Sequence, residues 1–194
     1  MRAAFAEEIE TLAGEDERIV LLSGDIGNRM FDTFKEKFVN RFYNCGVAEA
    51  NMTGMASGMA LCGLRPFTYT ITAFNTARVL EQIRLDVCYQ NLPVTVIGMG
   101  AGVIYSTLGS THHTMEDIAV ASAIPNMTVL APCDPEEMRL ATAWCATENT
   151  GPVYMRLGKA GEPDLTADAP ELFVTVTASL VDYYQYYKNN QDKN

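Results

Sequence analysis

Basic residues and histidines are scarce in this chain, and no apolar run is long. The 14 Lys and Arg residues are outnumbered by 24 Asp and Glu residues, which gives a net charge of -10. A basic surface that holds a nucleic-acid backbone is therefore not expected. The apolar runs at 94–99 and 118–124 are too short to span a bilayer. Because the N-terminus also predicts an amphipathic helix rather than a secretory signal, the composition indicates a cytoplasmic protein.

The chain also lacks the spacings that mark metal, disulfide and phosphate sites. Its five cysteines are odd in number and show no C-x-x-C spacing, which argues against a disulfide framework. The only two histidines, His112 and His113, are adjacent, so their side chains do not share a face of a helix or strand, and a zinc site built from both is not expected. No P-loop motif is present, and Gly98, Gly100 and Gly102 lack the third glycine of a dinucleotide fingerprint.

Short apolar runs alternate with helical patterns along most of the sequence. The runs predict six strands, at 18–22, 41–45, 66–71, 94–99, 128–131 and 153–157. Helical spacing falls between them, at 2–13, 50–62, 76–90, 115–123 and 135–148. This alternation predicts an α/β fold with a mainly parallel six-stranded sheet covered by helices on both faces. We expect one domain over residues 1–158, then a linker-like segment and a poorly ordered tail over 159–194.

Residues that follow strands are the candidates for a site, because ligands bind parallel sheets at the carboxyl ends of the strands. Glu49 is at the start of a helix, where the helix dipole alone favours a carboxylate. Alternatively, it is a catalytic group, if an apolar setting lets its carboxyl group share a proton. Asp25 follows a strand and could simply form an Asx turn. His112 lies in a long loop, and Phe74 opens a helix at the same edge, where it could equally be a core aromatic.

Several motifs stand in order between Leu21 and Leu157, and together they resemble the central domain of transketolases and deoxyxylulose-phosphate synthases. The strings include Leu-Ser-Gly-Asp25, Gly-Val-Ala-Glu49-Ala-Asn, Ala-Phe74-Asn-Thr-Ala-Arg78, Gly-Ser-Thr-His112-His and Gly-Pro-Val-Tyr-Met-Arg156. No single string is specific to this family. The combination is specific: the glutamate motif, then the aromatic loop, then the Thr-His loop. The resemblance implies the thiamine diphosphate-binding fold, and within it the domain that binds the pyrimidine.

The resemblance also implies which residues meet the cofactor. Glu49 would hydrogen-bond N1′ of the aminopyrimidine and so help its 4′-nitrogen to remove the C2 proton of the thiazolium. Phe74 would pack on the aminopyrimidine, with Ile71 at the position where the family usually has a second aromatic. Arg78 would lie beside the cofactor, and Asp25 near both the cofactor and the dimer interface.

Two further residues are implied to meet the substrate. His112 matches the histidine that contacts the donor sugar and is, with Glu49, a candidate catalytic residue. Arg156 matches an arginine that binds the substrate phosphate. Leu108 replaces an acidic residue of the family, and Gly100 stands where many transketolases have a further histidine. A conventional sugar-phosphate specificity therefore does not follow from the resemblance.

Two parts of transketolases are missing from the sequence. The Gly-Asp-Gly…Asn motif that holds the diphosphate and Mg²⁺ has no counterpart, since the nearest string, at 24–27, differs from it. The family's C-terminal domain, expected after Ala169, is also missing. We therefore expect a companion chain to supply the diphosphate site and most of the Mg²⁺ ligands, in a dimer of heterodimers.

The sequence thus predicts a transketolase-like subunit that transfers a two-carbon ketol unit between sugars or sugar phosphates once it is joined by its companion. The first alternative is a β-type subunit of an oxo-acid dehydrogenase, which shares the fold and the glutamate. The second is a non-catalytic truncated or regulatory domain. A dinucleotide-binding module built on 98–102 is the weakest alternative.

Overall fold

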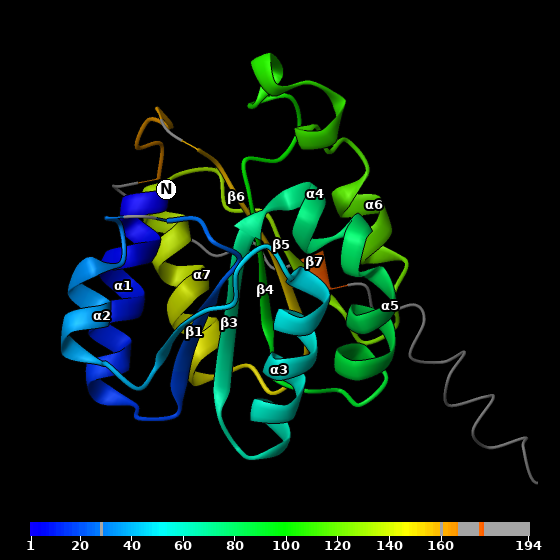
Figure 1. Ribbon diagram of the computed structural model, residues 1–194. Coiled ribbons are helices and arrows are strands. Elements are labelled where there is room, and N and C mark those ends of the chain that lie inside the picture. The colour runs from blue at the N-terminus through cyan, green and yellow to red at the C-terminus, as the bar shows by residue number, and fades with distance from the viewer. Residues whose placement is uncertain (28, 160, 167–174, 177–194) are drawn as a thin grey trace, which may run out of the picture.

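A parallel β-sheet lies at the centre of the molecule, with helices on both of its faces (Figure 1). The structure, a computed structural model, describes residues 1–27, 29–159, 161–166 and 175–176. The strands lie in the order β2-β1-β3-β4-β6-β5-β7. Their bounds are β1 Ile19–Ser23, β2 Phe42–Asn44, β3 Arg65–Ile71, β4 Thr95–Met99, β5 Thr128–Leu130, β6 Val153–Leu157 and β7 Thr175–Val176.

All six expected strands are present and run parallel, so the predicted fold class is confirmed. The short β7 was not expected, and it pairs antiparallel with β5. It falls within the segment 159–194 that the sequence assigned to a linker and tail. Most of that segment, including 177–194, lies outside the described residues.

The helices follow the expected alternation, with three differences. Their bounds are α1 Arg2–Glu15, α2 Asp32–Lys37, α3 Glu49–Leu61, α4 Thr72–Asn75, η1 Ala77–Val79, α5 Leu80–Gln82, η2 Ile83–Cys88, η3 Ser106–Leu108, η4 Ser110–His112, α6 Asp117–Ser122 and α7 Pro135–Thr147. The short helices α2 and α4 were missed, and the single helix expected at 76–90 was wrong: that stretch is divided into a 3₁₀ turn, an α turn and a π-helical turn. No helix in the described part of the chain is long and apolar enough to cross a membrane.

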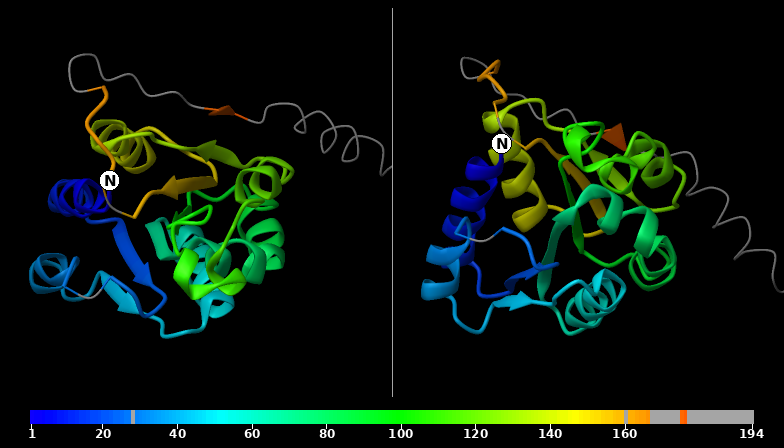
Figure 2. Two further views of the ribbon diagram at one scale, coloured as in Figure 1. Left: turned by 90° about the horizontal axis from the view of Figure 1, so that it is seen from above. Right: turned by 45° about the horizontal axis from the view of Figure 1, so that its top comes forward.

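Two apolar cores lie on opposite faces of the sheet, because successive strand residues point to opposite sides. In β1, Ile19 and Leu21 belong to the core beneath α1, α2 and α7, whereas Val20 and Leu22 belong to the core beneath α3, η1, η2 and α6. Figure 2 shows these two helical layers from above. Burial on both faces explains why the strands appear in the sequence as continuous apolar runs.

Helix α3 packs on the sheet through Met52, Ala56 and Ala60, all of which are buried. Its side toward η2 is fixed by the Ser57 hydroxyl, which donates to the Asp86 carbonyl oxygen at 2.7 Å. Within the helix, the Thr53 hydroxyl donates to the carbonyl oxygen of Glu49 at 3.0 Å. These contacts fix the first turn of α3 and therefore the position of the Glu49 side chain.

Asp134 joins the start of α7 to the segment at 165–166. Its Oδ1 accepts the backbone N–H of Glu137 at 2.9 Å, which makes it the N-cap of α7. Its Oδ2 accepts the backbone N–H groups of Leu165 and Thr166 and the Thr166 hydroxyl. Burial alone would raise the pKa of Asp134, but these hydrogen bonds outweigh it and lower the pKa to about 2.

Replacing Asp134 should make the free energy of unfolding depend less on pH in the acid range. A carboxylate whose folded pKa is lowered stabilises the protein above its unfolded pKa, and this contribution is lost as the pH falls toward about 2. We expect Asp134→Ala to cost about 1–2 kcal/mol near neutral pH through the lost cap, and much less near pH 2.5. Thermal unfolding at both pH values tests this, with the exposed Asp164→Ala as the control. An equal loss of stability at both pH values would contradict the conclusion that the ionised Asp134 carboxylate stabilises the fold.

Candidate active site

The carboxyl ends of the strands carry the residues that the sequence marked as a site. Helix α3 begins with Glu49 soon after β2, and α4, which holds Phe74, follows β3 directly. The loop between β4 and α6, which contains His112, rises above this edge of the sheet (Figure 1). Three separate crossovers therefore meet at one edge, as expected for a parallel sheet.

Glu49 is a buried carboxylate with one oxygen paired and one oxygen free. The residue is 2% exposed, and its Oε2 accepts a hydrogen bond from Arg78 Nη1 at 3.0 Å. Its Oε1 is buried and has no hydrogen-bond partner among the described residues. A buried acceptor left without a donor costs about 1–3 kcal/mol. This oxygen is therefore an unsatisfied hydrogen-bond acceptor that a ligand's donor could meet. The Arg78 side chain is 46% exposed, so the ion pair joins a buried carboxylate to a guanidinium that reaches solvent.

A series of stacked groups extends from this ion pair to the histidine. The Arg78 guanidinium lies over the Phe74 ring, with Cζ 4.2 Å from the ring centroid. Phe74 in turn meets His112 edge to face, with ring centroids 5.1 Å apart and an interplanar angle of 69°. The structure therefore brings together Glu49, the neighbouring pair Phe74 and Arg78, and His112, which come from three separate stretches of the sequence.

Two residues at this edge were not identified from the sequence. The Tyr105 ring lies 6.0 Å from the His112 ring, between centroids, on the loop that follows β4. The Lys159 ammonium lies over Tyr105, 4.4 Å from its centroid. Neither residue belongs to a local motif, and only the fold of the loop places them beside His112.

Arg156 belongs to a second cluster, built on a buried aspartate. Its Nε lies 3.0 Å from Oδ2 of Asp117, which is 1% exposed. The same oxygen accepts the Tyr154 hydroxyl at 2.6 Å. Burial and, next, the neighbouring Asp117 charge raise the pKa of Tyr154 well above its ordinary value, so the hydroxyl stays a donor. Gly98 leaves room for this arrangement, since a Cβ there would lie 2.7 Å from the Tyr154 oxygen.

Asp25 and Ile71 lie at the margins of the site. Asp25 adopts a left-handed backbone conformation with φ 59°, as in the turn that the sequence allowed. Its Oδ1 accepts Asn44 Nδ2 at 2.9 Å, which fixes the loop that leads to Glu49. Ile71 ends β3, and its side chain is buried in the core on the α1 and α7 side of the sheet.

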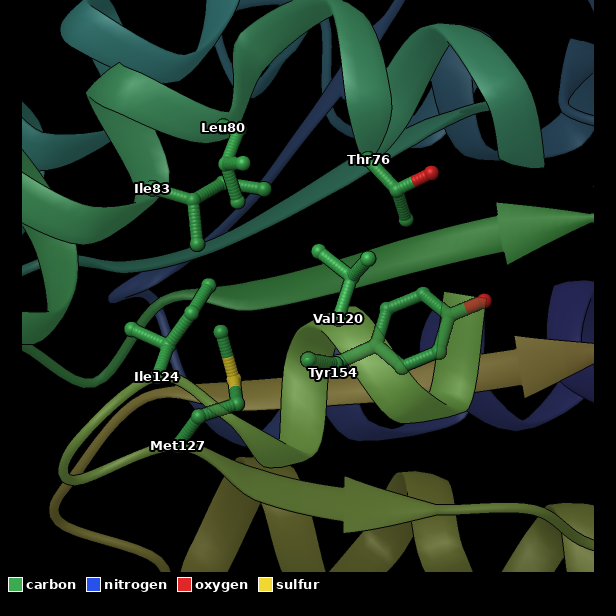
Figure 3. Close-up of a pocket in the computed structure, with 8 residues that line it drawn as sticks. Thr76, Leu80, Ile83, Val120, Ile124, Met127 and Tyr154 are labelled. Atoms are coloured by element: carbon green, nitrogen blue, oxygen red, sulfur yellow. The ribbon is translucent and has the colours of Figure 1, made fainter. Parts of the chain in front are cut away.

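A separate pocket lies between α5, η2 and α6, above β6 (Figure 3). Its lining is aliphatic or sulfur-containing except for two hydroxyl-bearing side chains, and it consists of Thr76, Leu80, Ile83, Val120, Ala121, Ile124, Met127 and Tyr154. None of these side chains is charged at neutral pH. The pocket therefore offers no charged side chain for catalysis, unlike the cluster around Glu49.

The fold and this cluster define an α/β domain with a candidate site at the carboxyl edge of a parallel sheet. The chain belongs to the transketolase pyrimidine-binding domain family: residues 1–161 match the family described as "Transketolase, pyrimidine binding domain". This confirms the resemblance stated from the motifs. The family implies thiamine diphosphate as the cofactor, and the free Oε1 of buried Glu49 beside the Phe74 ring fits a donor-bearing aromatic heterocycle.

Similar proteins include two that are named as transketolase subunits. The chain is 34% identical over 165 residues to a subunit of the apulose-4-phosphate transketolase of Phocaeicola vulgatus, covering 84% of this chain and 53% of the relative. It is 37% identical over 158 residues to a 6-deoxy-6-sulfo-D-fructose transketolase subunit of a Clostridium species, covering 81% and 49%. The chain thus spans about half the length of these curated relatives.

A solved structure supports the same relationship. It is described as a split gene transketolase, inactive beta4 tetramer, and it matches with a TM-score of 0.79 and 34% identity. The match covers 89% of this chain and 55% of that chain. The shared arrangement therefore includes nearly all of the domain.

The Glu49–Arg78 pair should show strong energetic coupling. Removing the arginine alone leaves a buried charge without a counter-ion, whereas removing the charge as well relieves that cost. We expect Arg78→Met and Glu49→Gln to couple by about 1–3 kcal/mol in a double-mutant cycle, measured by urea unfolding. The exposed Arg84→Met, on the same helical stretch, should not couple to Glu49→Gln. Additive effects for Arg78 and Glu49 would contradict the pairing.

Proposed function

We propose that this chain is the pyrimidine-binding subunit of a transketolase-like enzyme that transfers a two-carbon ketol unit between sugars. The observation that carries the proposal is the buried Glu49 carboxylate with one oxygen free. A carboxyl group in this position suits the aminopyrimidine of thiamine diphosphate, because it can share a proton with N1′. When bound, that cofactor supplies the nucleophilic carbon and the electron sink for cleaving a ketose.

The chain's own residues would hold and orient the reactants. Glu49 would keep a proton at N1′, while Arg78 balances the charge of the carboxylate from the solvent side. The Phe74 ring would pack on the aminopyrimidine and exclude water from it. His112 is half-buried, and its Nδ1 lies 2.9 Å from the Thr111 hydroxyl, so its other ring nitrogen is available to a sugar hydroxyl.

We further propose that a companion chain supplies the diphosphate and Mg²⁺ site, in an assembly with two copies of each chain. Two observations support this. Relatives of this chain are named as subunits of transketolases, and the split gene transketolase of the solved structure is described as an inactive tetramer. By the same reasoning, this chain alone would not catalyse the reaction.

Ketol transfer by the reconstituted pair tests the function. We expect a mixture of this chain and its companion, with thiamine diphosphate and Mg²⁺, to transfer a two-carbon unit from a ketose to an aldose. Glu49→Gln should lower kcat at least about 100-fold, because positioned proton transfer contributes about 10²–10⁴. The exposed Glu81→Gln, which changes the same functional group nearby, should keep the rate. An assembled pair with no turnover on any ketose would overturn the proposal.

The donor sugar should carry an anionic end group. Arg156 is one-third exposed, and its Nε forms an ion pair with Asp117 at 3.0 Å without hydrogen-bond geometry, so its two Nη groups can meet a phosphate or sulfonate. The names of the two relatives, one a sugar phosphate enzyme and one a sulfo-sugar enzyme, support this class.

We expect Arg156→Gln to raise the KM for an anionic ketose about 10- to 100-fold, since it loses a charge-assisted contact. The KM for an uncharged ketose should change little. Steady-state kinetics on the two donors measure the difference. Equal effects on both donors would show that Arg156 acts on the fold rather than on the anion.

A further inference from the structure

Tyr105 occupies space that only a glycine at position 100 can leave open. Gly100 has φ +73°, a left-handed conformation, and a Cβ built there would overlap the Tyr105 ring. The Tyr105 hydroxyl lies 3.1 Å from Met99 Sδ at the end of β4. Gly100 and Met99 therefore form a seat in which the tyrosine ring folds back onto the strand end.

The seated ring forms one side of a clamp around His112. Phe74 contacts the imidazole with centroids 5.1 Å apart at 69°, and Tyr105 contacts it with centroids 6.0 Å apart at 65°. The two rings come from different crossovers, α4 after β3 and the loop after β4. Edge-to-face contacts restrict an imidazole both in position and in tilt.

Polar contacts further restrict the His112 imidazole and the Tyr105 ring. The Thr111 hydroxyl lies 2.9 Å from His112 Nδ1, and Lys159 lies over the Tyr105 ring. Burial raises the pKa of Tyr105, with the Arg2 charge acting in the opposite direction, so the phenol stays neutral near neutral pH. A neutral ring keeps its attraction for the lysine and its packing against the histidine.

We propose that Tyr105 is a positioning residue, which holds His112 against Phe74 so that the free ring nitrogen faces the donor sugar. The ring of Tyr105 performs this role, rather than its hydroxyl. The kinetic part of the proposal rests on the proposed transketolase function, whereas the structural part concerns this chain alone.

Proton NMR of the free subunit tests the clamp directly, because the chain has only two histidines. Comparison with His112→Gln assigns the two sets of imidazole C–H signals. We expect Tyr105→Leu to shift the His112 signals by removing a ring current and to leave those of His113 nearly in place. Tyr105→Phe should keep His112 near its original shifts. The exposed Val103→Ala, on the same loop, should also leave them unchanged.

Unchanged His112 signals in a folded Tyr105→Leu variant would overturn the clamp. Gly100→Ala provides a second route to the same result, since the added methyl group would displace the ring and should shift His112 as Tyr105→Leu does. Circular dichroism of each variant verifies the fold.

Kinetics with the companion subunit then test the role in the reaction. Loss of one aromatic contact should lower kcat/KM for the ketose donor about two- to tenfold in Tyr105→Leu, with recovery in Tyr105→Phe. Wild-type kcat/KM in Tyr105→Leu would overturn the positioning role. If the wild-type pair has no turnover while the NMR shifts change as expected, the clamp stands and the proposed function fails.

Discussion

The Glu49 carboxylate is buried, and its one counter-ion among the described residues, Arg78, reaches it from the solvent side. This half-satisfied ion pair is the constraint on which the rest of the site depends. A buried charge is tolerated only when it is paired, so Arg78 must stay beside Glu49, and its guanidinium in turn stacks on Phe74. The oxygen that Arg78 does not reach has no hydrogen-bond partner among the described residues, and leaving a buried acceptor unpaired costs about 1–3 kcal/mol.

The sheet supplies the geometry that makes such a site possible. Because the central strands are parallel, α3, α4 and the loop after β4 all begin at one edge, where they bring Glu49, Phe74 and His112 together. Packing of α3 on the sheet and the Ser57–Asp86 bond hold the glutamate, while the tyrosine seat at Gly100 holds the histidine. The site is thus assembled from two helices and one long loop, whose His112 is held between Phe74 and Tyr105.

Much of this fold could be predicted from the sequence, since strands buried on both faces give continuous apolar runs and α3 and α7 are long enough to show helical spacing. The helices α2 and α4, of 6 and 4 residues, are too short for a periodic signal. The division of 76–90 was also hidden, because a π-helical turn keeps the same residue types in a different hydrogen-bond pattern. Motifs marked Glu49 and His112 as candidates, and the structure places them in one cluster. Tyr105 and Asp117 could not be found, because their roles arise from contacts between segments that are separate in the sequence.

We propose that the free oxygen of Glu49 is the position where the cofactor's pyrimidine binds. Calorimetric titration of thiamine diphosphate with Mg²⁺, into the wild-type and Glu49→Gln chains in the presence of the companion subunit, tests it most directly. We expect the wild-type pair to bind the cofactor and the Glu49→Gln pair to bind it about 10- to 100-fold more weakly, because the variant loses a hydrogen bond to a charged group. Equal affinities in two assembled pairs would contradict the account.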